Sequence, residues 1–277
     1  MTRGCSVDRY GVIGNPIGHS KSPLIHAQFA SQTGQSLHYE AILAELGTFP
    51  AAVAAFRAAG GRGLNVTVPF KQEAWQLADA RTPRAERAGA VNTLWWDDAG
   101  RLWGDTTDGI GLVRDLRDNL RLALAGLRIL LVGAGGAARG VVEPLLAERP
   151  RRLTIVNRTA DRAVVLAENF RELGAVSGCG FDELGAQEFD LVINATAAGL
   201  SGAVPPLNAA VFADGARAYD MMYASEPTAF VRWSLQAGAA QAWDGLGMLV
   251  EQAAEAFWIW RGVRPETGPV IAWLRAG

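Results

Sequence analysis

Lysine is rare in this chain, so the positions that keep it are the first candidates for chemistry. Of the 26 basic residues only Lys21 and Lys71 are lysines, and all the others are arginines. Arginine carries the same charge but does not release its proton near neutral pH, whereas lysine can transfer one. These two positions are therefore candidates for proton transfer. The alternative is that the composition disfavours lysine and that these two lysines remain by chance.

Small polar residues gather in stretches of the N-terminal half, beside the ends of predicted strands. The stretches cover residues 14–23, 65–71, 90–93 and 104–109. Their hydroxyls and amides, together with an ammonium and a carboxylate, would suit a ligand that carries several hydroxyl groups and a carboxylate. The alternative is that each stretch is only a polar loop.

A glycine-rich turn in the second half predicts a dinucleotide site. Residues 133–138 read G-A-G-G-A-A, which matches G-x-G-x-x-A directly after the predicted strand 127–132. The first glycine allows a tight turn, the second lets a pyrophosphate approach the backbone, and Ala138 permits close helix–strand packing. The helix that follows offers free N–H groups and a positive dipole end to the phosphates. The alternative is a glycine turn in an α/β domain that binds no nucleotide.

The end of the next strand favours NADP over NAD. NAD sites place an Asp or Glu about 20 residues after the glycine turn, where it binds the ribose 2′-hydroxyl. This chain has Asn157, Arg158 and Thr159 there, with Arg162 one turn later. Arg158 can pair with a 2′-phosphate and stack on the adenine, and Thr159 and Arg162 can add to the same anion site. The alternative is that these are ordinary surface arginines.

The elements that must position these groups alternate along the whole chain, which predicts an α/β fold with largely parallel sheets between helices. In the first half we expect strands at 10–14, 37–43, 63–68, 91–96 and 101–104, and helices at 22–33, 49–59 and 109–122. In the second half we expect strands at 127–132, 153–157, 189–194, 216–223 and 239–243, and helices at 137–148 and 246–260. Ser22 is expected to cap the first helix, with Pro23 at its first helical position.

Composition excludes several classes of protein. The chain has 277 residues, of which 49% are hydrophobic, so it is neither disordered nor fibrous, and one or two domains are expected. The net charge of −2 gives no overall field for nucleic acid or an anionic membrane surface. Cys5 and Cys179 form no disulfide framework, and neither a signal peptide nor a membrane span is visible, so a cytoplasmic protein is expected. The histidines lack the spacing of a zinc site, and no bound metal is expected.

Taken together, the polar stretches and the glycine turn resemble the NADP-dependent shikimate dehydrogenase family over nearly the whole chain. The shared motifs occur in the family's order and spacing: G-N-P-I-x-H-S-K-S-P, N-V-T-V-P-F-K, G-A-V-N-T, G-D-x-T-D-G, G-A-G-G-A, N-R-T, N-A-T-x-x-G and D-G-L-G-M-L-V-x-Q. The resemblance implies reversible NADPH-dependent reduction of 3-dehydroshikimate to shikimate, in the biosynthesis of chorismate and aromatic amino acids. It also implies a small-molecule substrate and a monomer or homodimer that binds neither nucleic acid nor membrane.

The resemblance also assigns roles to single positions. Lys71 and Asp108 match the family's catalytic lysine and aspartate. Substrate-binding positions are matched by Ser20, Ser22, Thr67, Asn92, Tyr223 and Gln252. NADP-binding positions are matched by Gly133, Ala134, Gly135, Gly136, Ala137, Asn157, Arg158, Thr159, Arg162, Met221 and Gly245. Pro83 stands where many relatives have an acidic residue, and Ala197-Ala198 where many have two serines, so these positions receive no role.

The chemistry of the catalytic pair also follows from its residue types. Oxidation of a secondary alcohol needs a base that removes the hydroxyl proton while hydride leaves for the nicotinamide, and such a base contributes about 10²- to 10⁴-fold in rate. Lys71 follows Pro69 at the end of a predicted strand, and Asp108 lies where the chain passes from the first α/β unit to the second. We expect the pair at a cleft between the two, where ligands bind. A structural salt bridge is the alternative.

Two domains are expected. Residues 1–107 with 245–277 would form a mostly parallel α/β substrate-binding domain, and residues 108–244 a Rossmann-like NADP-binding domain. The long helix after Asp244 would return to the first domain and bring Gln252 to the substrate. Two alternative functions stay open: a quinate/shikimate dehydrogenase with broader substrate or NAD use, and a non-enzymatic metabolite-sensing protein with the same fold.

Overall fold

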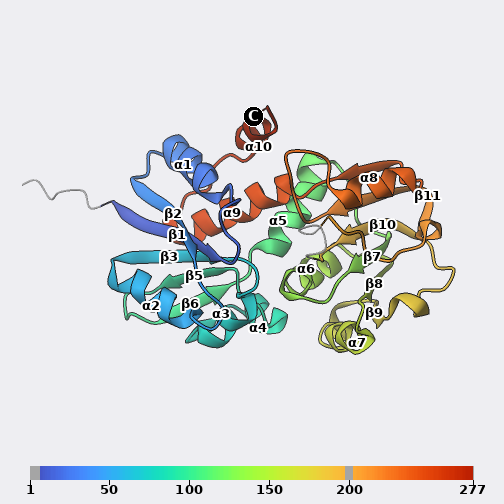
Figure 1. The fold of residues 1–277 in the computed structure, drawn as a ribbon, viewed down its shortest axis with the longest axis horizontal. Helices are drawn as coiled ribbons and strands as arrows, with labels where there is room; N and C mark the ends of the chain where they lie inside the picture. Colours follow the sequence, from blue (N-terminus) through green and yellow to red (C-terminus); the bar gives the residue numbers. More distant parts are fainter. Residues whose placement is uncertain (1–6, 197–201, 277) are drawn as a thin grey trace, which may run out of the picture. The chain divides into compact units, whose positions relative to one another are not determined.

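The computed structural model describes residues 7–196 and 202–276 (Figure 1). Cys5, Ala197 and Ala198, which were considered above, lie outside these ranges. In the described part of the chain, no helix is both long enough and apolar enough to cross a bilayer. Nor do three His, Cys, Asp or Glu side chains converge there as a metal site would need.

The chain divides into two compact units. One comprises residues 1–111 with 249–277, and the other comprises residues 112–248. The chain passes from one unit to the other within two helices, α5 (Asp108–Arg114) and α9 (Leu246–Arg261). The domain limits expected from the sequence, and the ligand assigned to each domain, stay a prediction.

The sheet of the first unit has six strands in the order β2-β1-β3-β5-β6-β4. These strands are β1 (Asp8–Gly14), β2 (Leu37–Leu43), β3 (Gly61–Val66), β4 (Ala80–Arg81), β5 (Thr93–Trp96) and β6 (Leu102–Asp105). β1 is parallel to β2 and β3, and β4 is parallel to β6, whereas β5 is antiparallel to both of its neighbours. The expected mostly parallel α/β sheet is confirmed, with β5 as the strand that reverses direction.

The reversal at β5 brings the polar stretches to one edge of this sheet. β1 and β3 are parallel, so they end at the same edge, at Gly14 and Val66. β5 begins at that edge, because Thr93 pairs with Asn65 near the end of β3. β6 runs back and pairs Asp105 with Thr93, so it ends there too. Four stretches that are far apart in the sequence therefore meet.

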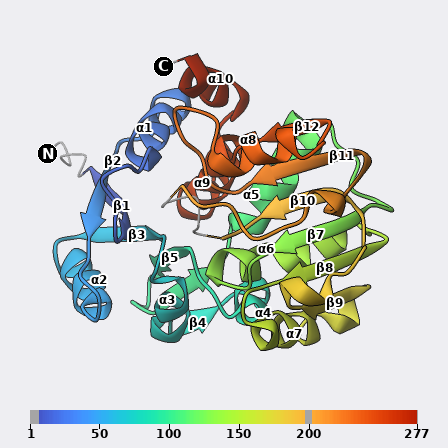
Figure 2. The ribbon, with the colours of Figure 1, turned by 45° about the vertical axis from the view of Figure 1, so that its right-hand side comes forward.

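Helices cover both faces of this sheet, because alternate side chains of a strand point to opposite faces. The helices confined to this unit are α1 (Ser22–Thr33), α2 (Phe49–Ala58), α3 (Lys71–Leu77), α4 (Pro83–Ala88) and α10 (Gly268–Ala276). Helices α2, α3 and α4 pack on the face that carries Leu64 and Leu94. Helices α1 and α9 pack on the other face, where Trp260 stacks on Tyr10 at 4.7 Å between ring centroids. Helix α10 lies near α1 in Figure 2.

His26 lies in an aromatic layer formed by α1, β2 and α9. Its ring stacks on Tyr39 at 4.0 Å between ring centroids and also contacts Phe257 and Trp260. The side chain is fully buried, and neither ring nitrogen has a hydrogen bond of normal length to the described residues. Burial lowers the pKa of His26 to about 3, and the Asn65 side chain offsets this effect only in part.

Replacing His26 with phenylalanine is expected to reduce the acid sensitivity of the fold. Between about pH 6.5 and about pH 3, the unfolded chain binds a proton that the native His26 does not, so native stability falls as the pH falls. Over this range the wild type should lose about 1.4 kcal/mol of unfolding free energy per pH unit more than His26→Phe does. Urea unfolding at about pH 7 and about pH 5 measures this. The exposed His38→Gln should keep the wild-type slope, and equal slopes for wild type and His26→Phe would contradict the prediction.

The sheet of the second unit is entirely parallel, in the order β12-β11-β10-β7-β8-β9. Its strands are β7 (Arg128–Val132), β8 (Arg152–Val156), β9 (Val176–Cys179), β10 (Phe189–Asn194), β11 (Phe212–Asp220) and β12 (Gln241–Trp243). Counted in chain order, this is the 3-2-1-4-5-6 order of doubly wound nucleotide-binding sheets, which confirms the expected Rossmann-like fold. The order reverses between β7 and β10, and ligands of such sheets bind outside the carboxyl ends of the strands at that point.

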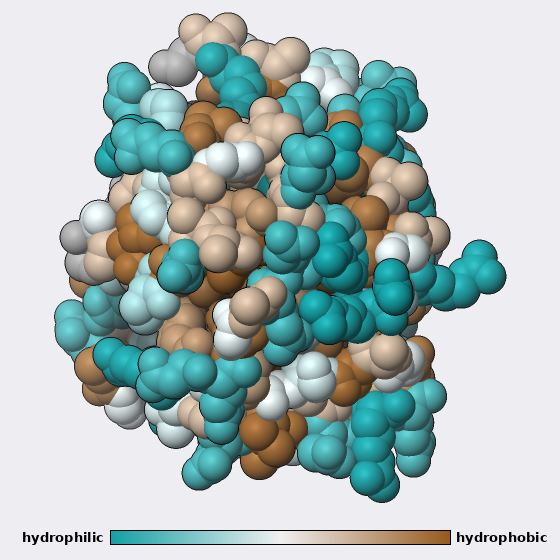
Figure 3. Space-filling model, turned by 90° about the vertical axis from the view of Figure 1, so that its right-hand side faces the viewer, coloured by the Kyte–Doolittle hydropathy of each residue, from teal (hydrophilic) through white to brown (hydrophobic). Residues whose placement is uncertain are grey.

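Both faces of the second sheet are buried, so its central strands are nearly continuous apolar runs. Helices α6 (Gly136–Ala147) and α7 (Ala160–Glu168) pack on the face of Ile129 and Leu131. Helix α8 (Ala229–Gln236) packs on the opposite face, with Leu130 and Val132. The space-filling view in Figure 3 shows one face of the molecule, where hydrophilic residues are spread between smaller groups of hydrophobic ones.

The start of α1 differs from the expectation. Lys21 is its N-cap and Ser22 is already the first helical residue, so the predicted cap at Ser22 is wrong. The cap makes no side-chain hydrogen bond. Instead, the Ser22 N–H donates to Ser20 Oγ at 3.3 Å, so a serine two residues earlier satisfies this free N–H group.

Two other elements end earlier than expected, although β3 also begins two residues earlier, at Gly61. The strand predicted at 63–68 ends at Val66, because the chain turns there and the Phe70 N–H donates to Thr67 O at 3.0 Å. The helix predicted at 109–122 leaves regular α-helical geometry after Arg114 and ends before Arg121, which has a φ of +56°.

Candidate functional site

Lys71 and Asp108 form an ion pair at the edge where the polar stretches meet. Lys71 Nζ lies 2.6 Å from Asp108 Oδ2, and the two side chains are 13% and 8% exposed. Lys71 is the first residue of α3, and Asp108 is the first residue of α5. The carboxylate therefore lies at a helix N-terminus, where the helix dipole favours negative charge. The ion pair holds the Lys71 nitrogen at this edge of the sheet.

Asn92 connects this pair to its surroundings. Its Nδ2 lies 3.0 Å from Asp108 Oδ1, 2.9 Å from Thr107 Oγ1 and 3.2 Å from Gln252 Oε1. Its Oδ1 accepts from the Thr107 backbone N–H at 2.8 Å and from the Thr93 hydroxyl at 2.9 Å. Because a backbone N–H can only donate, these bonds fix the amide with its NH₂ group toward Asp108. The structure thus brings together four predicted site residues: Lys71, Asp108, Asn92 and Gln252.

A second polar layer supports Asn92 from behind. Asn65 Nδ2 lies 3.2 Å from Thr93 Oγ1 and 3.3 Å from the Asn92 backbone oxygen. Tyr39 donates its hydroxyl to Asn65 Oδ1 at 2.7 Å, and burial raises the pKa of Tyr39 well above its ordinary value. Sequence reasoning selected none of these three residues. Asn65 and Thr93 lie inside the polar stretches, so the sequence marked their neighbourhood as a candidate site. Tyr39 lies outside these stretches, and no sequence pattern marked it.

Ser20, Ser22 and Thr67 follow neighbouring parallel strands, with Ser20 and Thr67 on loops and Ser22 at the start of α1. Ser20 and Ser22 are on the chain that leads from β1 into α1, and Thr67 follows β3. A Cβ at Gly14 would lie 2.4 Å from Thr67 Cγ2, so the end of β1 can approach Thr67 only because residue 14 is glycine. The three hydroxyl residues therefore share an edge of the sheet with Lys71. Their contact with a substrate stays a prediction.

The glycine turn has the shape that a dinucleotide requires. Gly133 has a φ of +111°, and a Cβ there would lie 3.1 Å from Thr196 Cγ2. Its N–H donates to Val156 O at 2.7 Å, which ties the end of β7 to β8. A Cβ at Gly135 would meet no atom of the described residues within 4 Å, so the backbone is open there to a pyrophosphate. Residues 134–137 complete the turn and open α6.

The loop after β8 carries the predicted 2′-phosphate site. Asn157 Nδ2 donates to Thr159 O at 2.9 Å, and the Arg162 N–H donates to the same oxygen at 3.1 Å, so the loop closes onto α7. Arg158 is exposed. Arg139 of α6 has a buried Nε that lacks a hydrogen-bond partner among the described residues, and its pKa is lowered by burial and then by Arg162. Neighbouring guanidinium groups favour an anion between them. Arg139 was not selected from the sequence, although this residue directly follows the glycine motif.

Met221 and Gly245 meet in the second unit. A Cβ at Gly245 would lie 2.4 Å from the Met221 backbone oxygen, so only glycine allows this approach. Asn194 donates to Asp220 at 3.0 Å, which ties the ends of β10 and β11 together just before Met221. Burial raises the pKa of Asp220. The predicted nicotinamide positions therefore lie together, Met221 after β11 and Gly245 after β12 (Gln241–Trp243).

Tyr223 is the predicted substrate residue that the first unit does not contain. It follows β11 by three residues and belongs to the second unit, whereas Ser20 and Ser22 belong to the first. Its contact with the substrate carboxylate stays a prediction.

Three family models match this chain. The substrate binding domain of shikimate dehydrogenase matches residues 12–94. Shikimate / quinate 5-dehydrogenase matches residues 116–201, and the C-terminal domain of shikimate 5′-dehydrogenase matches residues 245–274.

Curated relatives and a solved structure match over nearly the full length. The chain is 59% identical to the shikimate dehydrogenase (NADP(+)) of Methylococcus capsulatus, over 97% of this chain and 96% of the relative. It is 60% identical to the enzyme of the same name from Alkalilimnicola ehrlichii, over 97% and 98%. Shikimate 5-dehydrogenase from Thermus thermophilus, solved in complex with NADP(H) and shikimate, is 34% identical with a TM-score of 0.85, over 98% of this chain and 99% of that one.

Proposed function

The chain belongs to the shikimate dehydrogenase family, and we propose that it catalyses the reversible NADPH-dependent reduction of 3-dehydroshikimate to shikimate. It is an NADP-dependent oxidoreductase of this family. The observation that carries the proposal is the ion pair of Lys71 and Asp108, with Asn92 bound to Asp108 and Gln252 bound to Asn92.

The polar groups around the pair suit the substrate. Shikimate is a small ring that carries three hydroxyl groups and one carboxylate. Asn92 and Gln252, together with Thr67, offer amide and hydroxyl groups for the ring hydroxyls. Ser20 and Ser22 offer hydroxyls for the carboxylate, with Tyr223 of the second unit as a further partner.

Lys71 is proposed as the acid/base. In the oxidising direction its amine would accept the proton of the reacting hydroxyl, and in the reducing direction its ammonium would donate one. Asp108 accepts a hydrogen bond from Lys71 at 2.6 Å and another from Asn92 at 3.0 Å, so Asp108 fixes the position of the lysine nitrogen. A positioned proton carrier of this kind is worth about 10²- to 10⁴-fold in rate.

The second unit is proposed to hold NADP, which when bound exchanges hydride with the alcohol carbon. The open backbone at Gly135 fits a pyrophosphate, since no described atom would meet a Cβ there within 4 Å. Arg158, Thr159 and Arg162 would hold the 2′-phosphate, and Met221 and Gly245 would line the nicotinamide. We place this activity in the cytoplasm, in a monomer or homodimer that acts on free small molecules.

Steady-state rates with shikimate and with quinate, each with NADP and with NAD, test the proposal. We expect shikimate with NADP to give the highest kcat/KM. A comparable kcat/KM with quinate or NAD would favour the quinate/shikimate dehydrogenase alternative. No turnover with any of the four pairs, together with retained binding of shikimate, would favour the metabolite-sensing alternative.

A further inference from the structure

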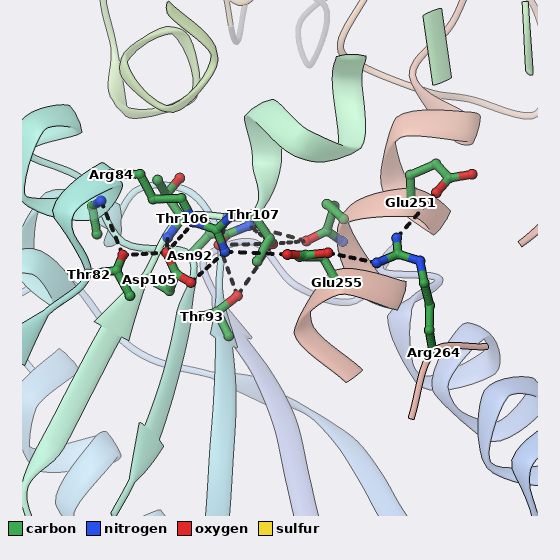
Figure 4. A network of polar contacts seen from close by, with 12 residues as sticks. Thr82, Arg84, Asn92, Thr93, Asp105, Thr106, Thr107, Glu251, Glu255 and Arg264 are labelled. Atoms are coloured by element: carbon green, nitrogen blue, oxygen red, sulfur yellow. Dashed lines mark hydrogen bonds and ion pairs between the residues drawn. The ribbon is translucent and has the colours of Figure 1, made fainter. Parts of the chain in front are cut away.

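Arg84 of α4 holds two buried carboxylates from different elements (Figure 4). Its Nε lies 2.7 Å from Asp105 Oδ1 and its Nη2 lies 2.6 Å from Asp105 Oδ2, which is a bidentate pair. The same Nη2 lies 3.5 Å from Glu255 Oε1. The Asp105 and Glu255 side chains are only 4% and 5% exposed. One guanidinium therefore joins the end of β6 to α9.

Asp105 and Glu255 each lie next to a residue of the candidate site, Asp105 through its backbone and Glu255 along α9. The Asp105 side chain accepts from the next backbone N–H at 2.7 Å, and its backbone oxygen accepts from the Asn92 N–H at 3.0 Å. Glu255 lies three residues after Gln252 on α9, so both side chains lie on the same face of the helix. Gln252 in turn lies 3.2 Å from Asn92, which bonds Asp108.

Without Arg84 this arrangement loses its charge balance. Glu255 would keep Arg264, which lies 2.8 Å away on its other side. Asp105 has no second ion pair among the residues that the structure describes. Asp105 would then be a buried carboxylate without an ion pair, and it would repel the Glu255 carboxylate at low dielectric. The repulsion acts directly between β6 and α9, and would move Gln252 away from Asn92.

We propose that Arg84 is a positioning residue for substrate recognition. By holding Asp105 and Glu255 on one guanidinium, it sets the distance between Gln252 on α9 and the Asn92–Asp108 pair. The inference rests on the proposed function, because it requires that Gln252 contacts the substrate.

Arg84→Met is expected to raise the KM for shikimate by about 10-fold, with a smaller change in kcat and none in the KM for NADP. A displaced Gln252 loses binding in the ground state and the transition state alike, which raises KM. Gln252→Ala should show the same pattern. The double variant Arg84→Met/Gln252→Ala should be no worse than Gln252→Ala, because Arg84 acts through that residue. Arg84→Met/Glu255→Gln should recover most of the affinity, because a neutral amide no longer repels Asp105.

Arg128→Met is the matched control. Arg128 makes a similar bidentate pair with Asp190 in the second unit, at 2.7 Å and 3.1 Å. Replacing Arg128 therefore removes the same kind of ion pair, but in the unit that does not contain Asn92 and Gln252. This variant should keep the wild-type KM for shikimate. Should Arg84→Met fail to fold, Arg84→Lys keeps the charge but loses the bidentate geometry, and a rise in KM of about 3-fold is expected.

The outcomes separate the inference from the function on which it rests. A wild type that does not oxidise shikimate overturns the proposed function. With an active wild type, the inference is overturned by an unchanged KM in both Arg84 variants. It is also overturned if the effects of Arg84→Met and Gln252→Ala simply add.

Discussion

Replacing Lys71 with arginine is expected to lower kcat for shikimate oxidation by about 10²- to 10⁴-fold. Arginine keeps the positive charge, and its guanidinium can pair with Asp108, so binding and folding should change little. It cannot release its proton near neutral pH, so the reacting hydroxyl loses its proton acceptor. Steady-state kcat and KM with shikimate and NADP measure the loss, and the thermal midpoint of unfolding checks that the fold is intact.

Lys21→Arg is the matched control for this variant. Lys21 is the other lysine of the chain and is the N-cap of α1. The same chemical change there should leave kcat within about 3-fold of the wild type. Near-native turnover in Lys71→Arg would show that Lys71 stabilises charge and does not carry the proton.

The sequence could place Lys71 and Asp108 because both lie next to a change of element. The preceding strand β3 ends at Val66, and Lys71 opens α3 after the short turn that contains Pro69. Asp108 opens α5 directly after β6. Residues at the ends of strands tend to be exposed to a ligand site, so local sequence was sufficient to select them.

The contacts that orient the pair could not be predicted, because they depend on strand direction and register. Asn65 meets Thr93 only because β5 runs antiparallel to β3 and pairs these two residues. In the expected parallel arrangement, the end of β5 and not its start would lie beside the end of β3. Likewise, Arg84 meets Glu255 only after α9 has returned to the first unit, and no local pattern encodes that distance.

In the first unit the expected helix 22–33 and strand 37–43 are α1 and β2 as observed. The second unit contains β9, α7 and α8, which were not expected, although its central strands were. Its strands are apolar on both faces, and the glycine turn fixes which strand is the first of the sheet. The expected strand at 189–194 is β10 as observed, and that at 153–157 differs from β8 by one residue at each end. Arg139 was missed because an arginine within an amphipathic helix looks like an ordinary surface residue. Only the structure shows that its Nε is buried and has no hydrogen-bond partner among residues 7–196 and 202–276.

Replacing Arg158 with aspartate is expected to lower the preference for NADP over NAD, measured as the ratio of kcat/KM values, by about 10²-fold or more. The residue follows β8, where NAD sites of this fold place a carboxylate that binds the ribose 2′-hydroxyl. Aspartate would repel the 2′-phosphate of NADP, which raises the KM for NADP, and would accept a hydrogen bond from NAD, which lowers the KM for NAD. The kcat values should change less, because the 2′ position is remote from the reacting carbon.

Arg151→Asp makes the same change of charge at the opposite end of the same strand. Arg151 directly precedes β8 and is exposed, so it lies at the amino end of the strand, whereas Arg158 follows the carboxyl end. This variant should retain the wild-type ratio, which would show that net charge alone does not set the preference. An unchanged ratio in Arg158→Asp would assign the 2′-phosphate to Arg139 and Arg162 instead. The affinity of variants at Arg139 and at Arg162 for 2′,5′-ADP would then test that assignment directly.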